Sequence, residues 1–317
     1  MFCVTYTSTP ISINLGNLRG PNHQPHAKFC RKERGFCSIT RSSPDFRLAN
    51  FPPTCSYSTG KKHFVLVHGS CHGAWCWYKL KPLLESAGDS VTAVDLSASG
   101  INTKSLLEIR TLHDYSEPLM ELMAAIPADE KVVLVGHSFG GYCLALAMDH
   151  CPKKVSLAIF VSAMMPDTVH PPAHFRDKYR ERFPAKDMLD AHISSYGSPE
   201  EPRTMVTLGP KYLSIKLYQL CSTEDLELAK LLVRPMPILK EDLSRTKPFS
   251  AEGYGSVKRA YIVCSEDNIM EADLQHWLAK SVGAAVVKEI KDADHMAMLS
   301  KPQELCQYLQ EIVDEHI

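Results

Sequence analysis

The strongest constraint on the fold is a series of short, nearly continuous apolar runs that alternate with helical patterns. The runs lack the strict apolar–polar alternation of a half-exposed strand, which is typical of strands buried on both faces of a parallel sheet. They cover residues 63–67, 91–96, 131–135, 155–161, 257–264 and 284–290. The helical patterns between and after them cover residues 74–87, 114–125, 140–150, 272–281 and 303–313. This order predicts an α/β fold with a mostly parallel, doubly wound sheet.

The alternation is interrupted between about residues 166 and 250. This stretch is rich in Pro, Tyr, Met and Leu, and residues 210–220 and 223–233 have helix-like patterns. Ser222 or Thr223 fits the N-cap of the second of these helices. Roughly 85 residues are too many for a loop, so we expect an inserted helical cap; the alternative is a continuation of the main domain.

Residues 1–60 differ in composition from the rest of the chain. They contain thirteen Ser or Thr and seven Lys or Arg, but only two acidic residues, Glu33 and Asp45. No helix or strand periodicity extends through them, so we leave them out of the predicted fold. A Ser-rich, Arg-bearing, acid-poor segment is typical of an organellar transit peptide, and a disordered extension is the alternative. We therefore expect a plastid location if the segment is a transit peptide and a cytoplasmic one otherwise.

The charge and cysteine pattern exclude several classes of protein. After residues 1–60 the chain has 28 basic and 34 acidic residues, which leaves a net charge of −6 and argues against a nucleic-acid surface. No apolar run approaches the ~18 residues that a membrane span requires. No cysteine pair has C-x-x-C spacing, so we expect no structural metal site.

A candidate nucleophile follows the third apolar run directly. Ser138 lies in the sequence Gly136-His137-Ser138-Phe139-Gly140, between a predicted strand and a predicted helix. The G-x-S-x-G pattern needs this context, because the serine occupies a strained turn and only small neighbours let strand and helix pass closely. The pattern therefore predicts an α/β-hydrolase fold with Ser138 as the nucleophile.

A serine nucleophile needs a base within hydrogen-bond reach and an acid that orients the base. In this fold the order along the chain is Ser, acid, His. His295 follows the last apolar run and fits the base, and Asp267 follows the run after the cap and fits the acid. Glu266 is an alternative acid, whereas Asp294 is not expected to orient the ring of its own neighbour.

The tetrahedral intermediate also needs backbone N–H donors for its oxyanion. One donor is expected from Phe139, the residue after the nucleophile. The other is expected from the glycine-containing loop after the first strand, where we assign the N–H of Ser70. Cys71 and His72 in the same loop are predicted to line the substrate pocket.

With these residues assigned, the sequence resembles the plant methylesterase family of α/β-hydrolases, the group of the salicylate-binding methylesterases and the hydroxynitrile lyases. The resemblance runs from about Lys61 to the end of the chain. It rests on six segments: residues 64–69, 71–75, 77–80, 136–138, 217–221 and 294–299. The family's triad falls on Ser138, Asp267 and His295, and its helical lid falls on the predicted cap.

The resemblance implies a serine esterase that hydrolyses the methyl ester of a small plant metabolite without a cofactor. Residues 91–96, 114–120 and 162–167 favour the branch that acts on indole alkaloid aldehyde esters, where decarboxylation follows. The alternative is a hormone ester: methyl salicylate, methyl jasmonate or methyl indole-acetate. The resemblance also allows a homodimer. The wall of the acyl pocket is predicted to include Met164, Tyr212, Leu213 and Met298.

Two other functions compete with the esterase. The lyases in this group carry Thr directly after the first-strand His and Lys directly after the catalytic His, and the Lys stabilises departing cyanide. Here the two positions are Gly69 and Met296, and a neutral Met cannot hold an anion. A non-catalytic ligand receptor is the third hypothesis, and the intact set of Ser138, Asp267 and His295 argues against it.

Overall fold

The computed structural model describes residues 61–182 and 188–317 of the 317-residue chain. The predicted extension over residues 1–60 lies outside the described residues, so the structure does not test it. Among the described residues, no helix combines the length and the apolar character that crossing a membrane requires.

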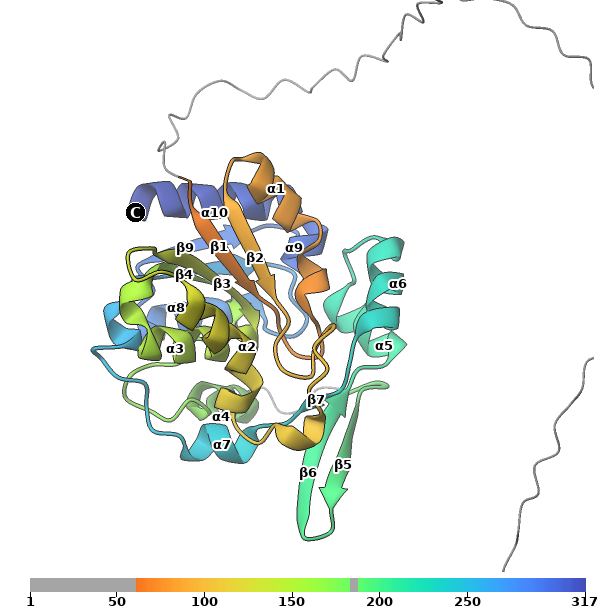
Figure 1. Ribbon diagram of the computed structural model, residues 1–317. Helices are drawn as coiled ribbons and strands as arrows, with labels where there is room; N and C mark the ends of the chain where they lie inside the picture. The colour runs from red at the N-terminus through yellow and green to blue at the C-terminus, as the bar shows by residue number, and fades with distance from the viewer. Residues whose placement is uncertain (1–60, 183–187) are drawn as a thin grey trace, which may run out of the picture. The chain divides into compact units, whose positions relative to one another are not determined.

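A six-stranded parallel sheet forms the centre of the described chain, with strand order β2-β1-β3-β4-β8-β9 (Figure 1). Every pairing in it is parallel. Its strands are β1 (His63–Val67), β2 (Ser90–Val94), β3 (Val132–Ser138), β4 (Val155–Ala163), β8 (Arg259–Cys264) and β9 (Val286–Ile290). The six predicted strands and the doubly wound order are therefore confirmed. All six carboxyl ends lie at one edge, which is where such sheets place their sites.

Helices cover both faces of this sheet, and alternate strand residues pack against opposite layers. On one face Leu66 and Val133 share a core with α1 (Leu80–Ser86) and α10 (Pro302–His316). On the other face Val65 shares a core with α2 (Leu112–Ala125), α3 (Gly140–His150) and α8 (Ala272–Val282). Burial on both faces explains why the strands read as continuous apolar runs.

The predicted helix over residues 74–87 is interrupted in the structure. The 3₁₀ turn η1 (Ala74–Trp77) comes first, and α1 starts again at Leu80. Pro82 explains the break, because proline has no N–H and its ring clashes with the carbonyl four residues earlier, at Tyr78. Pro82 is tolerated at the third position of α1, where an N–H has no intrahelical partner.

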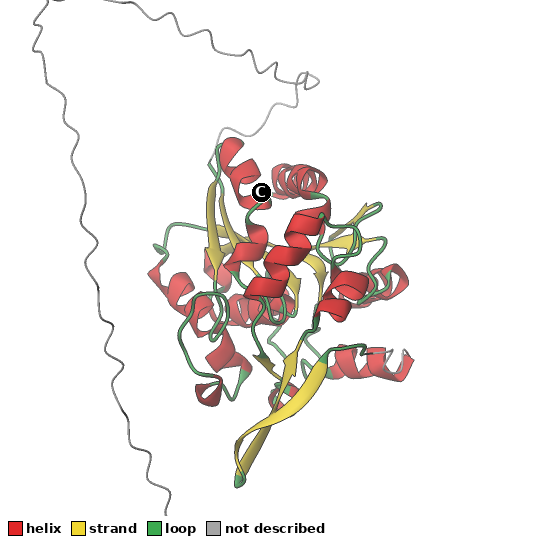
Figure 2. Cartoon of the chain, turned by 90° about the vertical axis from the view of Figure 1, so that its right-hand side faces the viewer, coloured by secondary structure: helices red, strands yellow, loops and turns green. Residues whose placement is uncertain are grey.

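The cap differs from the prediction, because it is not only helical. Residues 192–207 form an antiparallel hairpin of β5 (His192–Ser198) and β6 (Glu201–Thr207), which pairs with the short β7 (Met236–Pro237). Figure 2 shows the hairpin extending away from the surrounding helices. None of the residues of β5 or β6 is buried. The hairpin therefore has no apolar face to reveal it in the sequence.

The rest of the cap is helical, as predicted. Ser222 is the N-cap of α6 (Thr223–Leu232), and its Oγ accepts a hydrogen bond from the N–H of Asp225 at 3.2 Å. The predicted helix over residues 210–220 is shorter and consists of α5 (Pro210–Tyr212) and the π-helical turn η4 (Leu213–Leu217). The remaining elements are η2 (Leu106–Glu108), η3 (Pro152–Lys154), α4 (His174–Arg182), α7 (Lys240–Arg245), η5 (Tyr254–Ser256) and α9 (Ala297–Ser300).

Candidate active site

Ser138 lies in the sharp turn between β3 and α3. It is the last residue of β3, and its φ of +51° is in the left-handed region that residues with a Cβ rarely adopt. The turn depends on Gly140, because a Cβ there would lie 2.6 Å from the carbonyl oxygen of His68. The strand–turn–helix arrangement predicted around Ser138 is therefore present.

The predicted acid and base contact each other in the loops after β8 and β9. Asp267 Oδ2 lies 2.7 Å from His295 Nδ1, and both side chains are buried. The other carboxylate oxygen, Oδ1, accepts hydrogen bonds from the N–H groups of Ile269 at 2.7 Å and Met270 at 2.9 Å. Since a carboxylate accepts, Nδ1 of the neutral ring carries the proton and Nε2 is left with a lone pair.

The loop of His295 also meets the turn of Ser138. The ring of His137, the residue before Ser138, donates through Nε2 to the carbonyl oxygen of His295 at 2.8 Å. The His137 and His295 rings are 4.6 Å apart between centroids. Burial holds the pKa of His137 well below its usual value, so this ring stays neutral and packs locally.

The rival acids have other surroundings. Glu266 is exposed, so Asp267 is the acid that contacts His295. Asp294 is buried and accepts from the backbone N–H groups of Leu220 at 2.9 Å and Met296 at 3.0 Å. Its carboxylate joins the His295 loop to the cap.

The loop after β1 packs against the predicted nucleophile. A Cβ at Gly69 would lie only 2.7 Å from the Cβ of Ser138, so the backbone approaches the turn closely. His68 holds this backbone, because its Nδ1 hydrogen-bonds to the carbonyl oxygen of Gly69 at 2.8 Å and its Nε2 accepts from the N–H of Leu96 at 3.1 Å. Burial lowers the pKa of His68 to about 4, so the ring is neutral. Ser70, the predicted oxyanion donor, follows directly.

Phe139, the other predicted oxyanion donor, is the N-cap residue of α3. Its ring packs edge-on against Tyr115 and Tyr142, with centroids 5.8 and 5.2 Å away. The backbone N–H groups at the start of a helix favour negative charge. Phe139 and Ser70 thus lie on the two segments that flank the Ser138 turn.

Three of the predicted pocket residues lie in the loop after β1, directly after β4 and at the end of α5. Cys71 is buried, and its thiol contacts the carbonyl oxygen of Val206 in β6 at 3.7 Å. Burial raises the pKa of Cys71 to about 12, so the thiol keeps its proton. Met164 is half-buried and donates its N–H to Ser138 O at 3.0 Å. Tyr212 is half-buried at the end of α5.

The other three predicted pocket residues are buried. Leu213 and Met298 belong to the apolar core shared with α10. His72 is 1% exposed, and both of its ring nitrogens have hydrogen-bond partners. A role in substrate contact stays a prediction for all six residues.

One residue at the site was missed by sequence reasoning. Ser162, near the end of β4, donates a hydrogen bond from Oγ to Asp267 Oδ2 and lies 3.4 Å from His295 Nδ1. It is fully buried and has a φ of +39°. The available signal was its place at the carboxyl end of a strand next to β3, where polar side chains converge.

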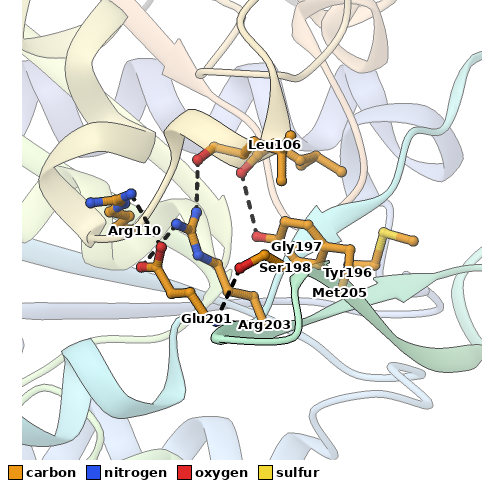
Figure 3. Close-up of a pocket in the computed structure, with 9 residues that line it drawn as sticks. Leu106, Arg110, Tyr196, Gly197, Ser198, Glu201, Arg203 and Met205 are labelled. Carbon is orange, nitrogen blue, oxygen red and sulfur yellow. Dashed lines mark hydrogen bonds and ion pairs between the residues drawn. The ribbon is translucent and has the colours of Figure 1, made fainter.

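A cavity of about 670 Å³ lies elsewhere, between the hairpin and η2 (Figure 3). Arg203 donates to the carbonyl oxygen of Leu107 at 2.8 Å and Arg110 pairs with Glu201 at 3.3 Å across it. Its lining is Leu106, Leu107, Arg110, Tyr196, Gly197, Ser198, Glu201, Arg203 and Met205. No residue predicted for chemistry lines it, so we do not assign the reaction to this cavity.

Within the described ranges, no group of three or more His, Cys, Asp or Glu side chains could hold a metal ion. The buried rings of His68, His137 and His295 form hydrogen bonds with oxygen atoms of the protein.

Comparisons with known proteins agree with this geometry. The sequence profile described as "Alpha/beta hydrolase family" matches residues 64–308. Norfluorocurarine synthase 1 of Strychnos nux-vomica is 64% identical over 256 residues, covering 80% of this chain and 96% of that protein. Methylesterase 3 of Arabidopsis thaliana is 52% identical over 257 residues, covering 81% of this chain and 97% of that protein.

Polyneuridine aldehyde esterase of Rauvolfia serpentina is 60% identical over 254 residues, covering 80% of this chain and 96% of that protein. The crystal structure of polyneuridine aldehyde esterase superposes with a TM-score of 0.79, covering 80% of this chain and 100% of that one. The predicted resemblance to the plant methylesterases and the predicted fold class are therefore confirmed.

Proposed function

The chain belongs to the alpha/beta hydrolase family and is a carboxylic ester hydrolase, and on this premise we propose that it is a serine methylesterase with Ser138 as nucleophile, His295 as base and Asp267 as acid. The observation that carries the proposal is the buried 2.7 Å contact between Asp267 and His295, beside a serine held at a φ of +51°.

In the first step, His295 Nε2 takes the proton of Ser138 as its Oγ attacks the ester carbonyl. The N–H groups of Ser70 and Phe139 stabilise the oxyanion, which is typically worth several kcal/mol of barrier. Asp267 accepts from Nδ1–H and stabilises the imidazolium that forms. The imidazolium then protonates the departing methoxide, and methanol leaves.

In the second step, water attacks the acyl-enzyme. His295 takes a proton from the water, and the same two N–H groups hold the second oxyanion. The proton then returns to Ser138 Oγ as the C–O bond to the acyl group breaks. The carboxylic acid leaves, and the chain's own residues supply every proton transfer.

For the substrate we propose the methyl ester of an indole alkaloid that carries an aldehyde β to the ester. The support is the 60–64% identity to polyneuridine aldehyde esterase and norfluorocurarine synthase 1, against 52% to Methylesterase 3. An acid with a carbonyl at the β position loses CO₂ readily, because the carbonyl takes up the electron pair as an enol. Decarboxylation therefore follows hydrolysis without a further catalytic group.

Two positions favour hydrolysis over cyanide elimination. A side chain at Gly69 would meet the Cβ of Ser138 at 2.7 Å, so a threonine there would force the nucleophile or the loop to move. Met296, next to His295, is fully buried and carries no charge. The site thus has no cation at the position where the lyases hold the cyanide ion.

The test is release of methanol from a panel of methyl esters by the wild-type protein and by Ser138→Ala. The panel contains an indole alkaloid aldehyde ester, methyl salicylate, methyl jasmonate and methyl indole-acetate. We expect the alkaloid ester to have the highest kcat/KM and Ser138→Ala to be inactive. Equal release by both proteins would refute the nucleophile, and preference for a hormone ester would refute the substrate. Tight binding without turnover would support a receptor.

The composition of residues 1–60 supports a proposal about location. Seven basic residues against two acidic ones, with thirteen Ser or Thr, favour a plastid transit peptide. We expect these residues, fused to a fluorescent protein, to direct it to plastids and to be removed there. A cytoplasmic signal with the segment intact would contradict this.

A further inference from the structure

Residues 218–221 of the cap, which follow η4, contact all three loops that carry the proposed chemistry. The contacts are hydrogen bonds from Tyr218 OH to His72 Nε2 at 2.7 Å, from Gln219 Nε2 to Glu266 O at 2.6 Å and from Leu220 N to Asp294 Oδ2 at 2.9 Å. His72 lies two residues after Ser70, and the other two partners are neighbours of Asp267 and His295. One short segment thus joins the cap to the loops that carry Ser70, Asp267 and His295.

The contact of Tyr218 with His72 has a defined direction. His72 Nδ1 lies 2.7 Å from the carbonyl oxygen of Ser70, which can only accept, so Nδ1 carries the proton. Burial lowers the pKa of His72 to about 4, so the ring is neutral and Nε2 has a lone pair. Burial also raises the pKa of Tyr218 well above its usual value, so its hydroxyl is protonated and donates.

This chain of hydrogen bonds ends on the proposed oxyanion donor. The carbonyl of Gly69 is held by His68, and the carbonyl of Ser70 is held by His72. These carbonyls belong to the peptide groups on either side of Ser70, so the two bonds together fix its backbone torsions and the direction of its N–H. His68 is anchored to the core through Leu96, whereas His72 is anchored to the cap through Tyr218.

We propose that Tyr218 is a positioning residue that holds the oxyanion loop through His72, and so couples the position of the cap to stabilisation of the transition state. This inference rests on the proposed function. Tyr218 does not need to touch the substrate, because its hydroxyl acts on the Ser70 backbone through the intervening ring.

The effect of the hydroxyl can be separated from packing. The His72 ring packs against Trp75 and Tyr218 with its plane nearly parallel to theirs, at centroid distances of 5.3 and 5.9 Å. Tyr218→Phe therefore keeps both stacking contacts and removes only the hydrogen bond. The oxyanion forms in the transition state and not in the bound ester, so the loss appears in kcat and not in KM.

The experiment measures hydrolysis of p-nitrophenyl acetate by the full chain, with rates expressed per active site titrated with diethyl p-nitrophenyl phosphate. We expect Tyr218→Phe to lower kcat about tenfold, part of the loss typical for removing a whole oxyanion donor, and to change KM less than twofold. The matched control is Tyr196→Phe, another cap tyrosine, whose hydroxyl donates to Leu106 O at 3.4 Å beside the remote cavity. It should retain wild-type rates.

Variants at His72 test whether Tyr218 acts through that ring. His72→Asn keeps an N–H at the δ position, where it can still donate to Ser70 O, but has no ε nitrogen. We expect His72→Leu to lose more activity than His72→Asn, and Tyr218→Phe to add no further loss to His72→Asn. Losses that multiply in the double variant would show that Tyr218 acts elsewhere and would overturn the proposal.

The same assay separates this inference from the function on which it rests. If Ser138→Ala keeps wild-type turnover, the proposed function fails. If Ser138→Ala is inactive and Tyr218→Phe has wild-type kcat, the positioning role alone fails. Fewer titratable sites in Tyr218→Phe with normal turnover per site would mark a purely structural role, and would also overturn the proposal.

Discussion

The strand ends of the central sheet and the hairpin of the cap differ in burial. Ser138 ends β3, a strand that is buried on both faces, and Asp267 and His295 contact each other in the interior. The hairpin residues are all partly or fully exposed, and their ion pairs and cavity face solvent. Buried packing holds the proposed catalytic side chains in fixed positions, whereas substitutions in the exposed hairpin should have little effect.

The largest effect is expected at Ser138, the proposed nucleophile. Ser138→Ala should lower kcat by about 10⁵-fold or more, because no other group can form the acyl-enzyme. The matched control is Ser198→Ala at the end of β5, which should keep wild-type kcat. Both are measured by ester hydrolysis. A large loss of kcat in Ser198→Ala would mean that the hairpin also contributes to the reaction.

The next effect is expected at Asp267, the proposed acid. Asp267→Asn should lower kcat by about 10⁴-fold, because an amide favours the wrong tautomer of His295. Its neighbour Glu266 is exposed, so Glu266→Gln should retain wild-type activity. Steady-state kinetics on the two isosteric variants make the comparison. Equal losses of kcat in the two variants would mean that activity depends on the loop as a whole and not on the Asp267 carboxylate.

An ion pair with a buried carboxylate joins α6 of the cap to the core, and stability should depend on it. Asp225 in α6 is fully buried and contacts Lys79 Nζ at 2.5 Å and Tyr78 OH at 2.6 Å. Asp225→Ala should lower the free energy of unfolding by about 3 kcal/mol, as expected for breaking a buried pair. Glu85→Ala, which removes an exposed pair with Lys81, should cost less than about 0.5 kcal/mol. Urea unfolding measures both.

The same pair predicts a pH dependence. Burial alone would raise the pKa of Asp225, but hydrogen bonds from Lys79, Tyr78 and Ser222 outweigh it and the pKa is lowered. A carboxylate with a lowered folded pKa adds stability above its unfolded pKa of about 3.9, and that stability is lost as the pH falls through the folded value. The stability difference between wild type and Asp225→Ala should therefore shrink below about pH 4. A constant difference down to pH 2 would contradict this.

The smallest effect is expected at the hairpin. Arg110 and Glu201 are largely exposed and 3.3 Å apart. Arg110→Ala should change the free energy of unfolding by less than about 0.5 kcal/mol and leave kcat unchanged. A larger loss of the free energy of unfolding, measured in urea, would mean that the hairpin stabilises the central sheet.

The two regions also differ in what sequence could predict. The buried strands follow from the apolar periodicity that burial imposes on their residues. The candidates Ser138, Asp267 and His295 follow from the G-x-S-x-G motif and from the order Ser, acid, His in this fold. The hairpin left no such trace, because neither face of β5 is buried. Ser162 and the Tyr218–His72 contact depend on segments 105 and 146 residues apart in the chain. Only the folded structure brings such groups together.

The turn at Ser138 has a consequence for how this protein can evolve. A serine at a φ of +51° costs the folded state on the order of 1–3 kcal/mol, a sizeable share of the net stability of an ordinary domain. The chain therefore carries backbone strain where it is proposed to be most reactive, and stability elsewhere in the fold must offset that strain. Mutations that destabilise the sheet would first reduce the number of further mutations that the fold can tolerate, and only later reduce the activity.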